Sequence, residues 1–114
     1  MTEMIYHMCR ADEWEAAVAS GSYAGSSQDK ADGFIHFSTA DQIVEGARRH
    51  RAGQDGLLLL AVDPAILGDR LKWEPSRAGA LFPHVYGTIS PAESTWVKPL
   101  PLGENGEHVF PALA

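Results

Sequence analysis

Short apolar segments alternate along the chain with polar, glycine-punctuated segments. Runs of apolar and aromatic residues bounded by Gly, Pro or Asp are typical of strands. Leu57–Val62 is apolar at every position, which predicts a strand covered on both faces at the centre of a sheet. The segment 82–86 is interrupted by Pro83, so we expect an edge strand or a loop crossing the sheet. The expected strands are 4–9, 33–37, 57–62, 70–74, 82–86 and 95–102.

Two segments carry a helical spacing of apolar residues between a start signal and a stop signal. The first is expected to begin at Asp12, which opens an acidic version of the capping box, and to end at Gly21. The second is expected to begin at Thr39, which forms a capping box with Gln42, and to end at Gly53. The basic residues near the end of this second helix complement the helix dipole, so we do not interpret them as a nucleic-acid patch.

The remaining segments are short. Single helical turns are expected at 64–67 and 90–93, and the polar segment 20–32 is expected to be mainly loop. Asn105-Gly106 predicts a hairpin near the C-terminus. Two longer helices and six or seven short strands predict one α+β domain over residues 1–114, with strongly bent mixed or antiparallel sheets.

Composition narrows the class of protein. The chain has 114 residues and a formal net charge of −6, which argues against nonspecific binding to nucleic acid or to an anionic membrane. Its longest apolar run, Leu57–Val62, is far shorter than the roughly 20 residues of a membrane-spanning helix. The first residues lack the pattern of a signal peptide, and the single Cys9 cannot form an internal disulfide. We therefore expect a cytoplasmic protein.

Several common catalytic motifs are missing from the sequence. It contains no GxGxxG segment, no phosphate-binding P-loop, no GxSxG and no HExxH. The histidines are scattered and there is no pair of cysteines, so no metal site is expected. Cys9 shares a strand face with Ile5 and His7 and is interpreted as a core thiol rather than a nucleophile.

A first candidate site lies where the strand 33–37 runs into the second helix. Strand alternation places Phe34, His36 and Ser38 on one face. The free N–H groups of a helix start near Ser38 and Thr39 favour an anion, and His36 can add a charged donor or act as a general acid or base. The structural alternative is that Ser38 or Thr39 only caps the helix and that His36 is a satisfied structural histidine.

A second candidate site combines the segments 73–77 and 82–87. Arg77 can bind a phosphate or a carboxylate in a bidentate manner, and Trp73 and Tyr86 offer flat faces for a ring. Glu74 can orient a hydroxyl or a histidine. The structural alternative is a loop held by aromatic packing and an Arg–Glu pair. The residues of this cluster are Trp73, Glu74, Ser76, Arg77, Phe82, His84 and Tyr86.

These motifs resemble, in order and over residues 4 to about 111, the bacterial domain-of-unknown-function 952 family. The matching blocks are Gly33–Thr39, Gly53–Asp55, Trp73–Arg77, Leu81–Gly87 and His108–Pro111. The resemblance implies an ADP-ribosyltransferase-like fold, in which two bent sheets meet around a cleft that holds a nicotinamide dinucleotide.

Three motifs of that superfamily can be compared with this chain. Tyr6-His7 is similar to the first motif, and the segment 33–38 leading into the helix is similar to the second. The third motif carries a Glu, and the late residues Glu93 and Glu107 do not lie in a recognisable version of it.

Three functions follow as hypotheses. The first is a transferase or glycosidic-bond-cleaving enzyme acting on NAD, ADP-ribose or another phosphate-bearing small molecule, with His36 and His84 as catalytic residues. The second is a non-catalytic module that binds the same ligand class. The third is a protein-interaction surface made by Trp73, Phe82 and Tyr86. The expected ligand-binding residues are His7, Ser38, Thr39, Trp73, Glu74, Ser76, Arg77, Phe82 and Tyr86.

Overall fold

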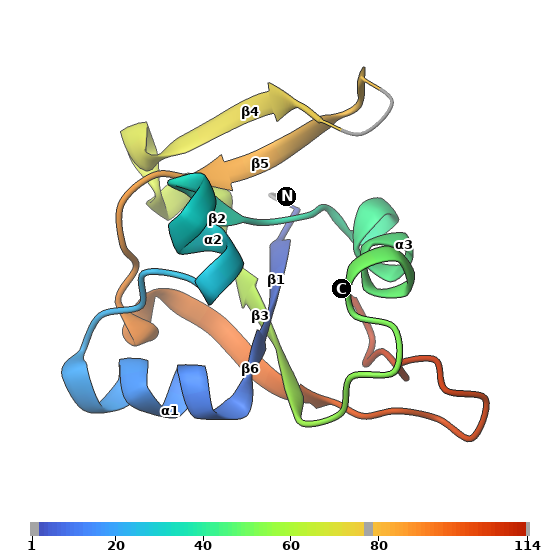
Figure 1. Cartoon of the computed structure of the whole chain (residues 1–114). Coiled ribbons are helices and arrows are strands. Elements are labelled where there is room, and N and C mark those ends of the chain that lie inside the picture. The colour runs from blue at the N-terminus through green and yellow to red at the C-terminus, as the bar shows by residue number, and fades with distance from the viewer. Residues whose placement is uncertain (1–2, 77–78, 114) are drawn as a thin grey trace.

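The computed structural model describes residues 3–76 and 79–113, which form two three-stranded antiparallel sheets and three α-helices (Figure 1). The first sheet has the strand order β1-β3-β6 and the second has the order β2-β5-β4. The strands are β1 Ile5–Arg10, β2 Ile35–His36, β3 Leu57–Val62, β4 Leu71–Pro75, β5 Leu81–Val85 and β6 Ser94–Leu100. The helices are α1 Ala11–Ser20, α2 Ser27–Asp32 and α3 Ala40–His50. The α+β class is confirmed.

The first sheet carries most of the core, and β3 lies at its centre as predicted. Along β3, Leu60 and Val62 belong to one buried cluster, whereas Leu59 and Ala61 belong to another. Because successive side chains of a strand point to opposite faces, the uniformly apolar sequence of β3 fills both clusters. Trp14 and Ala17 of α1 join the first cluster, and Ile43 of α3 joins the second.

The second sheet differs from its prediction. The segment around Pro83 is the central strand β5, and not an edge strand or a crossing loop. The carbonyl of Pro83 accepts from the N–H of Phe37, on the side of β2. The N and C=O of one residue in an antiparallel strand point to the same side, so the missing N–H of Pro83 costs no hydrogen bond to β4. β2 is also shorter than the predicted strand 33–37.

The start of α1 differs from its prediction. α1 is capped by Arg10 rather than Asp12, and the Arg10 N–H donates to the Glu13 carboxylate at 2.9 Å. Asp12 pairs instead with the Arg10 guanidinium at 2.7 Å. α1 ends at Gly21, as predicted, which adopts a left-handed φ of 84°.

Part of the segment 20–32 is helical. α2 begins after Ser26 and carries the sequence SQDKAD, which has no apolar spacing and gives no periodic signal. The prediction of a loop is therefore wrong for Ser27–Asp32.

α3 confirms the start predicted at Thr39, whose N–H donates to the Gln42 side chain at 3.0 Å. It ends at His50, before the predicted Gly53.

The short connections mostly follow the sequence. Single 3-10 turns lie at Pro64–Ile66 and Pro91–Glu93, as predicted, and a further one lies at Gly68–Arg70. Near the C-terminus the chain turns back, and Leu102 and His108 form an isolated bridge in place of a longer strand. None of the helices in the described ranges is long and apolar enough to cross a membrane.

Candidate functional site

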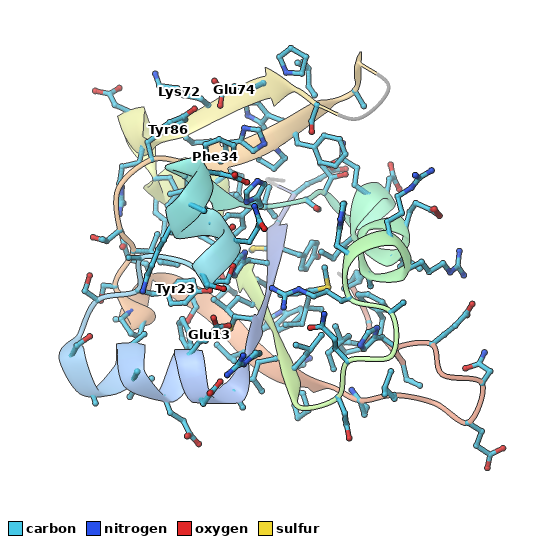
Figure 2. All side chains as sticks on the ribbon, in the orientation of Figure 1. Glu13, Tyr23, Phe34, Lys72, Glu74 and Tyr86 are labelled. Atoms are coloured by element: carbon cyan, nitrogen blue, oxygen red, sulfur yellow. The ribbon has the colours of Figure 1, made fainter. Side chains whose placement is uncertain are left out.

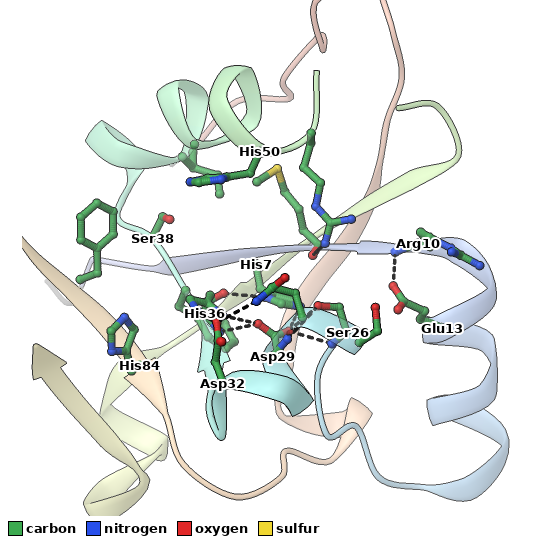
Figure 3. A pocket seen from close by; sticks show the side chains of 18 of the residues that line it. His7, Arg10, Glu13, Ser26, Asp29, Asp32, His36, Ser38, His50 and His84 are labelled. Atoms are coloured by element: carbon green, nitrogen blue, oxygen red, sulfur yellow. Dashed lines mark hydrogen bonds and ion pairs between the residues drawn. The ribbon is translucent and has the colours of Figure 1, made fainter. Parts of the chain in front are cut away.

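A cavity of about 980 Å³ is lined by residues of both sheets and of α1, α2 and α3. His7 comes from β1, His36 from β2, His84 from β5 and His50 from the end of α3, so four of the five histidines of the chain line one cavity. Figure 3 shows His36 and Asp29 close together on one wall, with Ser38 and His50 toward α3. The sequence scatters these histidines over the chain, and the fold brings them together.

Asp29 is buried and holds several donors of the site. The residue is 2% exposed. Its carboxylate accepts hydrogen bonds from the Ser26 N–H at 2.7 Å, the Ser26 hydroxyl at 2.9 Å and the His36 N–H at 3.0 Å. A fourth bond joins it to Nδ1 of His36 at 2.5 Å. Burial by itself raises the pKa of Asp29, but these donors and the nearby His7 outweigh burial and lower it to about 2. The carboxylate is therefore ionised at neutral pH.

Gly25 makes this arrangement sterically possible. Its φ is +98°, and a Cβ at this position would lie 2.6 Å from the Cβ of Asp29. No L side chain fits there without moving the aspartate, so the glycine is required by the close approach of the backbone to Asp29.

His36 is held between two carboxylates of α2. The hydrogen bond from its Nδ1 to Asp29 is the main cause that raises the pKa of His36, and Asp32 adds to it at 3.1 Å from Nε2. The His36 side chain is 40% exposed toward the cavity, whereas the Asp29 side chain is 3% exposed. This wall of the cavity therefore presents an imidazole whose protonated form is favoured and whose orientation is fixed by the carboxylate behind it.

His7 lies deeper and is neutral. Desolvation by burial is the main cause that lowers the pKa of His7. Its Nδ1 lies 2.6 Å from the carbonyl of His36 and its Nε2 lies 2.5 Å from the Tyr23 hydroxyl. A carbonyl only accepts, so the hydrogen sits on Nδ1 and the Tyr23 hydroxyl donates to Nε2. The predicted core thiol, Cys9, is fully buried nearby, and burial raises its pKa to about 12.

His84 is paired with Glu74 on the neighbouring strand. Its Nδ1 lies 2.8 Å from the Glu74 carboxylate, which also accepts from the Tyr86 hydroxyl at 2.7 Å. The ring of Phe34 stacks on that of His84 with centroids 4.1 Å apart. Figure 2 shows Phe34, Glu74 and Tyr86 gathered at the β4–β5 side of the molecule. The predicted role of Glu74, orienting a histidine and a hydroxyl, matches these contacts.

Arg51 supplies a guanidinium to the same cavity. It follows α3, is half-buried, and donates to the carbonyl of Met8 at 3.3 Å and to the Gln54 side chain at 3.1 Å. Within residues 3–76 and 79–113, no carboxylate lies within 4.0 Å of it as an ion-pair partner. A half-buried cation bonded only to neutral oxygens is well suited to receive an anion.

The predicted site residues divide into three groups. Those that line the cavity are His7, His36, Ser38, Ser76, Phe82 and His84. Four others do not line it: Glu74, which binds His84, Tyr86, which binds Glu74, and Thr39 and Trp73, of which Trp73 is 46% exposed. Arg77 lies outside the described residues.

At the helix start where an anion was expected, the N–H groups of Ser38 and Thr39 both have partners within the protein. The Ser38 N–H donates to the carbonyl of Tyr6 at 2.8 Å, and the Thr39 N–H donates to the Gln42 side chain at 3.0 Å. An anion in this cavity would have to displace one of these partners to bind either N–H group. The three residues of the predicted protein-interaction surface have different surroundings: Phe82 lines the cavity, Tyr86 is bound to Glu74, and Trp73 is exposed.

Sequence analysis did not identify Asp29, Tyr23 or Arg51. Ser26 followed three residues later by Asp29 is a capping-box signal that could have indicated a helix there. Arg51 was treated only as one of the basic residues that complement the dipole of the second helix. No local signal marks Tyr23, which meets His7 only through the tertiary fold.

The late glutamates Glu93 and Glu107 lie outside the cavity. Glu93 binds Arg70 at 2.7 Å, and Glu107 lies 3.7 Å from Arg48 on the surface. Neither lines the cavity described above. In the described part of the chain, no group of three or more His, Cys, Asp or Glu residues is arranged to hold a metal ion.

Comparison with known proteins identifies the family but not an activity. A crystal structure of protein CC0527 from Caulobacter crescentus is 44% identical to this chain, with a TM-score of 0.89 and coverage of 93% of each chain. A solution NMR structure of the same protein is 45% identical, with a TM-score of 0.82 and coverage of 91% of this chain and 90% of that one. No curated protein matches the chain. The family model described as "Protein of unknown function (DUF952)" matches residues 8–97, so the chain belongs to the DUF952 family.

Proposed function

We propose that the cavity binds a nucleotide-like, phosphate-bearing small molecule of the NAD or ADP-ribose type. The observation that carries this proposal is that the guanidinium of Arg51 and the imidazolium of His36 line one cavity. The donors of Arg51 are bonded to neutral oxygens, and Nε2 of His36 faces the exposed Asp32. An anionic oxygen can displace these partners and bind both cations. Phosphate is the anion that such a pair binds well, through charge-assisted hydrogen bonds.

The size and chemistry of the walls support the same ligand class. A volume of about 980 Å³ lies at the upper end of the range for small-molecule sites, and is large enough for a dinucleotide. Phe82 gives one wall an aromatic side chain, and Ser26, Ser38 and Gln28 add hydroxyl and amide groups that can bind a sugar.

The proposal includes the ADP-ribosyltransferase-like fold that the sequence motifs suggested. Its support is that both sheets contribute to one cavity, and that the residues of the first two motifs, His7 and Ser38, line it. The carboxylate of Asp29 is already bound by four donors, so it is poorly placed to hold a ribose as the third-motif Glu would. This favours binding, with any proton transfer to a departing group assigned to His36.

The experiment is an isothermal titration with ADP-ribose, NAD and adenosine. ADP-ribose and NAD are expected to bind, and adenosine, which lacks phosphate, is expected to bind at least tenfold more weakly. Arg51→Gln is expected to reduce the affinity for ADP-ribose by roughly 10- to 100-fold, since a charge-assisted hydrogen bond contributes about 1.5–3 kcal/mol.

Arg49→Gln is the matched control. Arg49 lies in the last turn of α3, just before Arg51, but it pairs with Glu45 on the surface and does not line the cavity. Its substitution should leave the affinity unchanged. No heat with either phosphate-bearing compound, or equal affinity for adenosine, contradicts the proposal.

A further inference from the structure

Two imidazole–carboxylate pairs stand side by side in the second sheet. His36 and His84 are direct partners in the β2–β5 register, and their ring centroids lie 5.6 Å apart. Asp29 binds Nδ1 of His36 at 2.5 Å, and Glu74 binds Nδ1 of His84 at 2.8 Å. Both rings line the cavity. The same arrangement is thus built twice from four separate segments of the chain.

A carboxylate on Nδ1 fixes the tautomer and leaves Nε2 as the reacting nitrogen. Nε2 of His84 has no hydrogen-bond partner in the described ranges. Every buried side-chain nitrogen or oxygen in the described residues has a hydrogen-bond partner. Because Nε2 of His84 has none, this atom is in contact with solvent. Nε2 of His36 faces Asp32, whose side chain is 38% exposed. An exposed ion pair of this kind contributes little, so a substrate oxygen can replace Asp32 there.

The two rings are held in different electrostatic settings. Asp29 and Asp32 of α2 face His36, and together they favour its protonated form. Among the described residues, neutral His7 from β1 and His84 from β5 are the other titratable groups near it. In its neutral form, His84 carries its hydrogen on Nδ1 toward Glu74 and presents a lone pair at Nε2. One ring can therefore give a proton while the other takes one.

Resting on the phosphate-binding function proposed above, we propose that His36 and His84 are the general acid and general base for hydrolysis of a nucleoside 2′,3′-cyclic phosphate. His84 Nε2 takes a proton from water as the water oxygen bonds to phosphorus. The bond from phosphorus to the ribose 2′-oxygen breaks, and His36 gives its Nε2 proton to that oxygen. One water is consumed, and the product is the nucleoside 3′-monophosphate. The two imidazoles then exchange their proton with solvent.

This substrate class fits the pair better than a phosphoanhydride does. The leaving group of a phosphodiester is an alkoxide, which needs a proton as its bond breaks, and the nucleophile is water, which needs a base. An acid and a base on neighbouring rings supply both. Arg51 lines the same cavity and can offset the negative charge that builds up on the phosphate oxygens.

The experiment follows cytidine and adenosine 2′,3′-cyclic phosphates by phosphorus NMR with the purified protein in EDTA. We expect conversion to the 3′-monophosphate and, in ¹⁸O-labelled water, one ¹⁸O in the product. His36→Gln and His84→Gln are each expected to lower kcat/KM by about 100-fold or more, as is usual for loss of a general acid or base. His108→Gln, which changes the histidine that does not line the cavity, should retain full activity.

Asp29 and Glu74 are positioning residues, and their variants test the arrangement without removing either ring. The profile of rate against pH should be bell-shaped, and its basic limb reports loss of the proton from His36. Asp29→Asn is expected to move that limb to lower pH, because the carboxylate no longer favours the imidazolium. Glu74→Gln is expected to lower kcat and leave the basic limb in place. Circular dichroism of each variant separates a folding defect from a loss of chemistry.

Binding of the 3′-monophosphate is measured separately by titration calorimetry. If the monophosphate binds with an Arg51-dependent affinity but the cyclic phosphate stays intact over hours, the acid–base pair is wrong and the binding function stands. If neither compound binds, both proposals fail. Hydrolysis that survives in both histidine variants, or that EDTA abolishes, also overturns the pair.

Discussion

The two sheets of this protein have the same number of strands but differ in burial and in the polar residues that they carry. In the β1-β3-β6 sheet, the central strand is buried almost throughout and its side chains supply two core clusters. In the β2-β5-β4 sheet, the strands carry His36, His84 and Glu74, and the edge strand β4 is half-buried or exposed along its length. The first sheet is a scaffold, and the second presents polar groups to the cavity that both sheets line.

This difference shows how stability and chemistry are separated in a small chain. The polar groups of the second sheet are oriented by partners that belong neither to the same strand nor to the scaffold core. Asp29 on α2 orients His36, and Glu74 across the sheet orients His84. Substitutions in the two regions should therefore have different consequences.

The largest expected effect is in the scaffold. Leu60 on β3 is fully buried, and Leu60→Ala should destabilise the protein by about 2–5 kcal/mol, since it removes apolar contacts and leaves a cavity. Urea denaturation measures the change. Leu81→Ala on β5 is the comparison, because Leu81 is 53% exposed and should change stability by about 0.5 kcal/mol or less. Equal costs at the two positions would mean that the sheets do not differ as described.

Asp29→Asn should have the next largest effect, at about 2–3 kcal/mol. The substitution removes a buried charge that four donors satisfy, and leaves some of these donors poorly paired. The pKa of His36, followed by NMR, should fall. Asp32→Asn removes only the exposed partner of His36 and should cost less than about 1 kcal/mol. If the two substitutions cost the same, Asp29 is not the main support of His36.

The pH dependence of stability gives a further test of Asp29. Its pKa is lowered from 3.8 to about 2 in the folded protein, so its stabilisation is present above pH 3.8 and is lost as the pH falls toward 2. The loss amounts to about 2 kcal/mol for one group with this shift. In Asp29→Asn, the free energy of unfolding measured against pH should lack this loss. A variant that loses stability in acid as the wild type does would contradict this assignment.

The contribution of His36 to the free energy of unfolding changes with pH in the opposite direction. Its pKa is raised in the folded protein, so its stabilisation is complete below its ordinary pKa of 6.5 and is lost as the pH rises through the raised value. Urea denaturation between pH 6 and 9 should show a smaller decline for His36→Gln than for the wild type. Because this side chain is 40% exposed, solvent screening keeps the effect modest.

The smallest effect is expected at Trp73. It is 46% exposed on the edge strand β4 and does not line the cavity. Trp73→Ala should change the free energy of unfolding by less than about 1 kcal/mol and leave the affinity for ADP-ribose unchanged. A marked loss of affinity would restore the role that the sequence suggested for this ring.

Much of the scaffold could be predicted from local patterns. The apolar run of β3, the capping box at Thr39 and the stop at Gly21 each carry their signal within a few residues. The prediction failed where the signal was weak or misleading. α2 has no apolar spacing, and Pro83 suggested an edge although its missing N–H faces away from β4.

The candidate site was only partly predictable. His36 and His84 were identified as candidate catalytic residues, and both line the cavity. Their carboxylate partners were not equally visible. Glu74 belongs to the same motif as its histidine in the sequence, whereas Asp29 lies in a segment predicted as loop. The guanidinium expected in the cavity was that of Arg77, which lies outside the described residues, whereas sequence analysis did not single out Arg51, which lines the cavity.

The sequence by itself determined the strands, the helix limits set by glycine and capping residues, and the residue types available for chemistry. These follow from backbone preferences and side-chain alternation, which act over a few residues. Only the tertiary structure decided that Asp29, His36, His84 and Arg51 line one cavity. Such contacts depend on how separate segments pack, and a carboxylate changes the proton affinity of an imidazole only when the fold holds the two within hydrogen-bond distance.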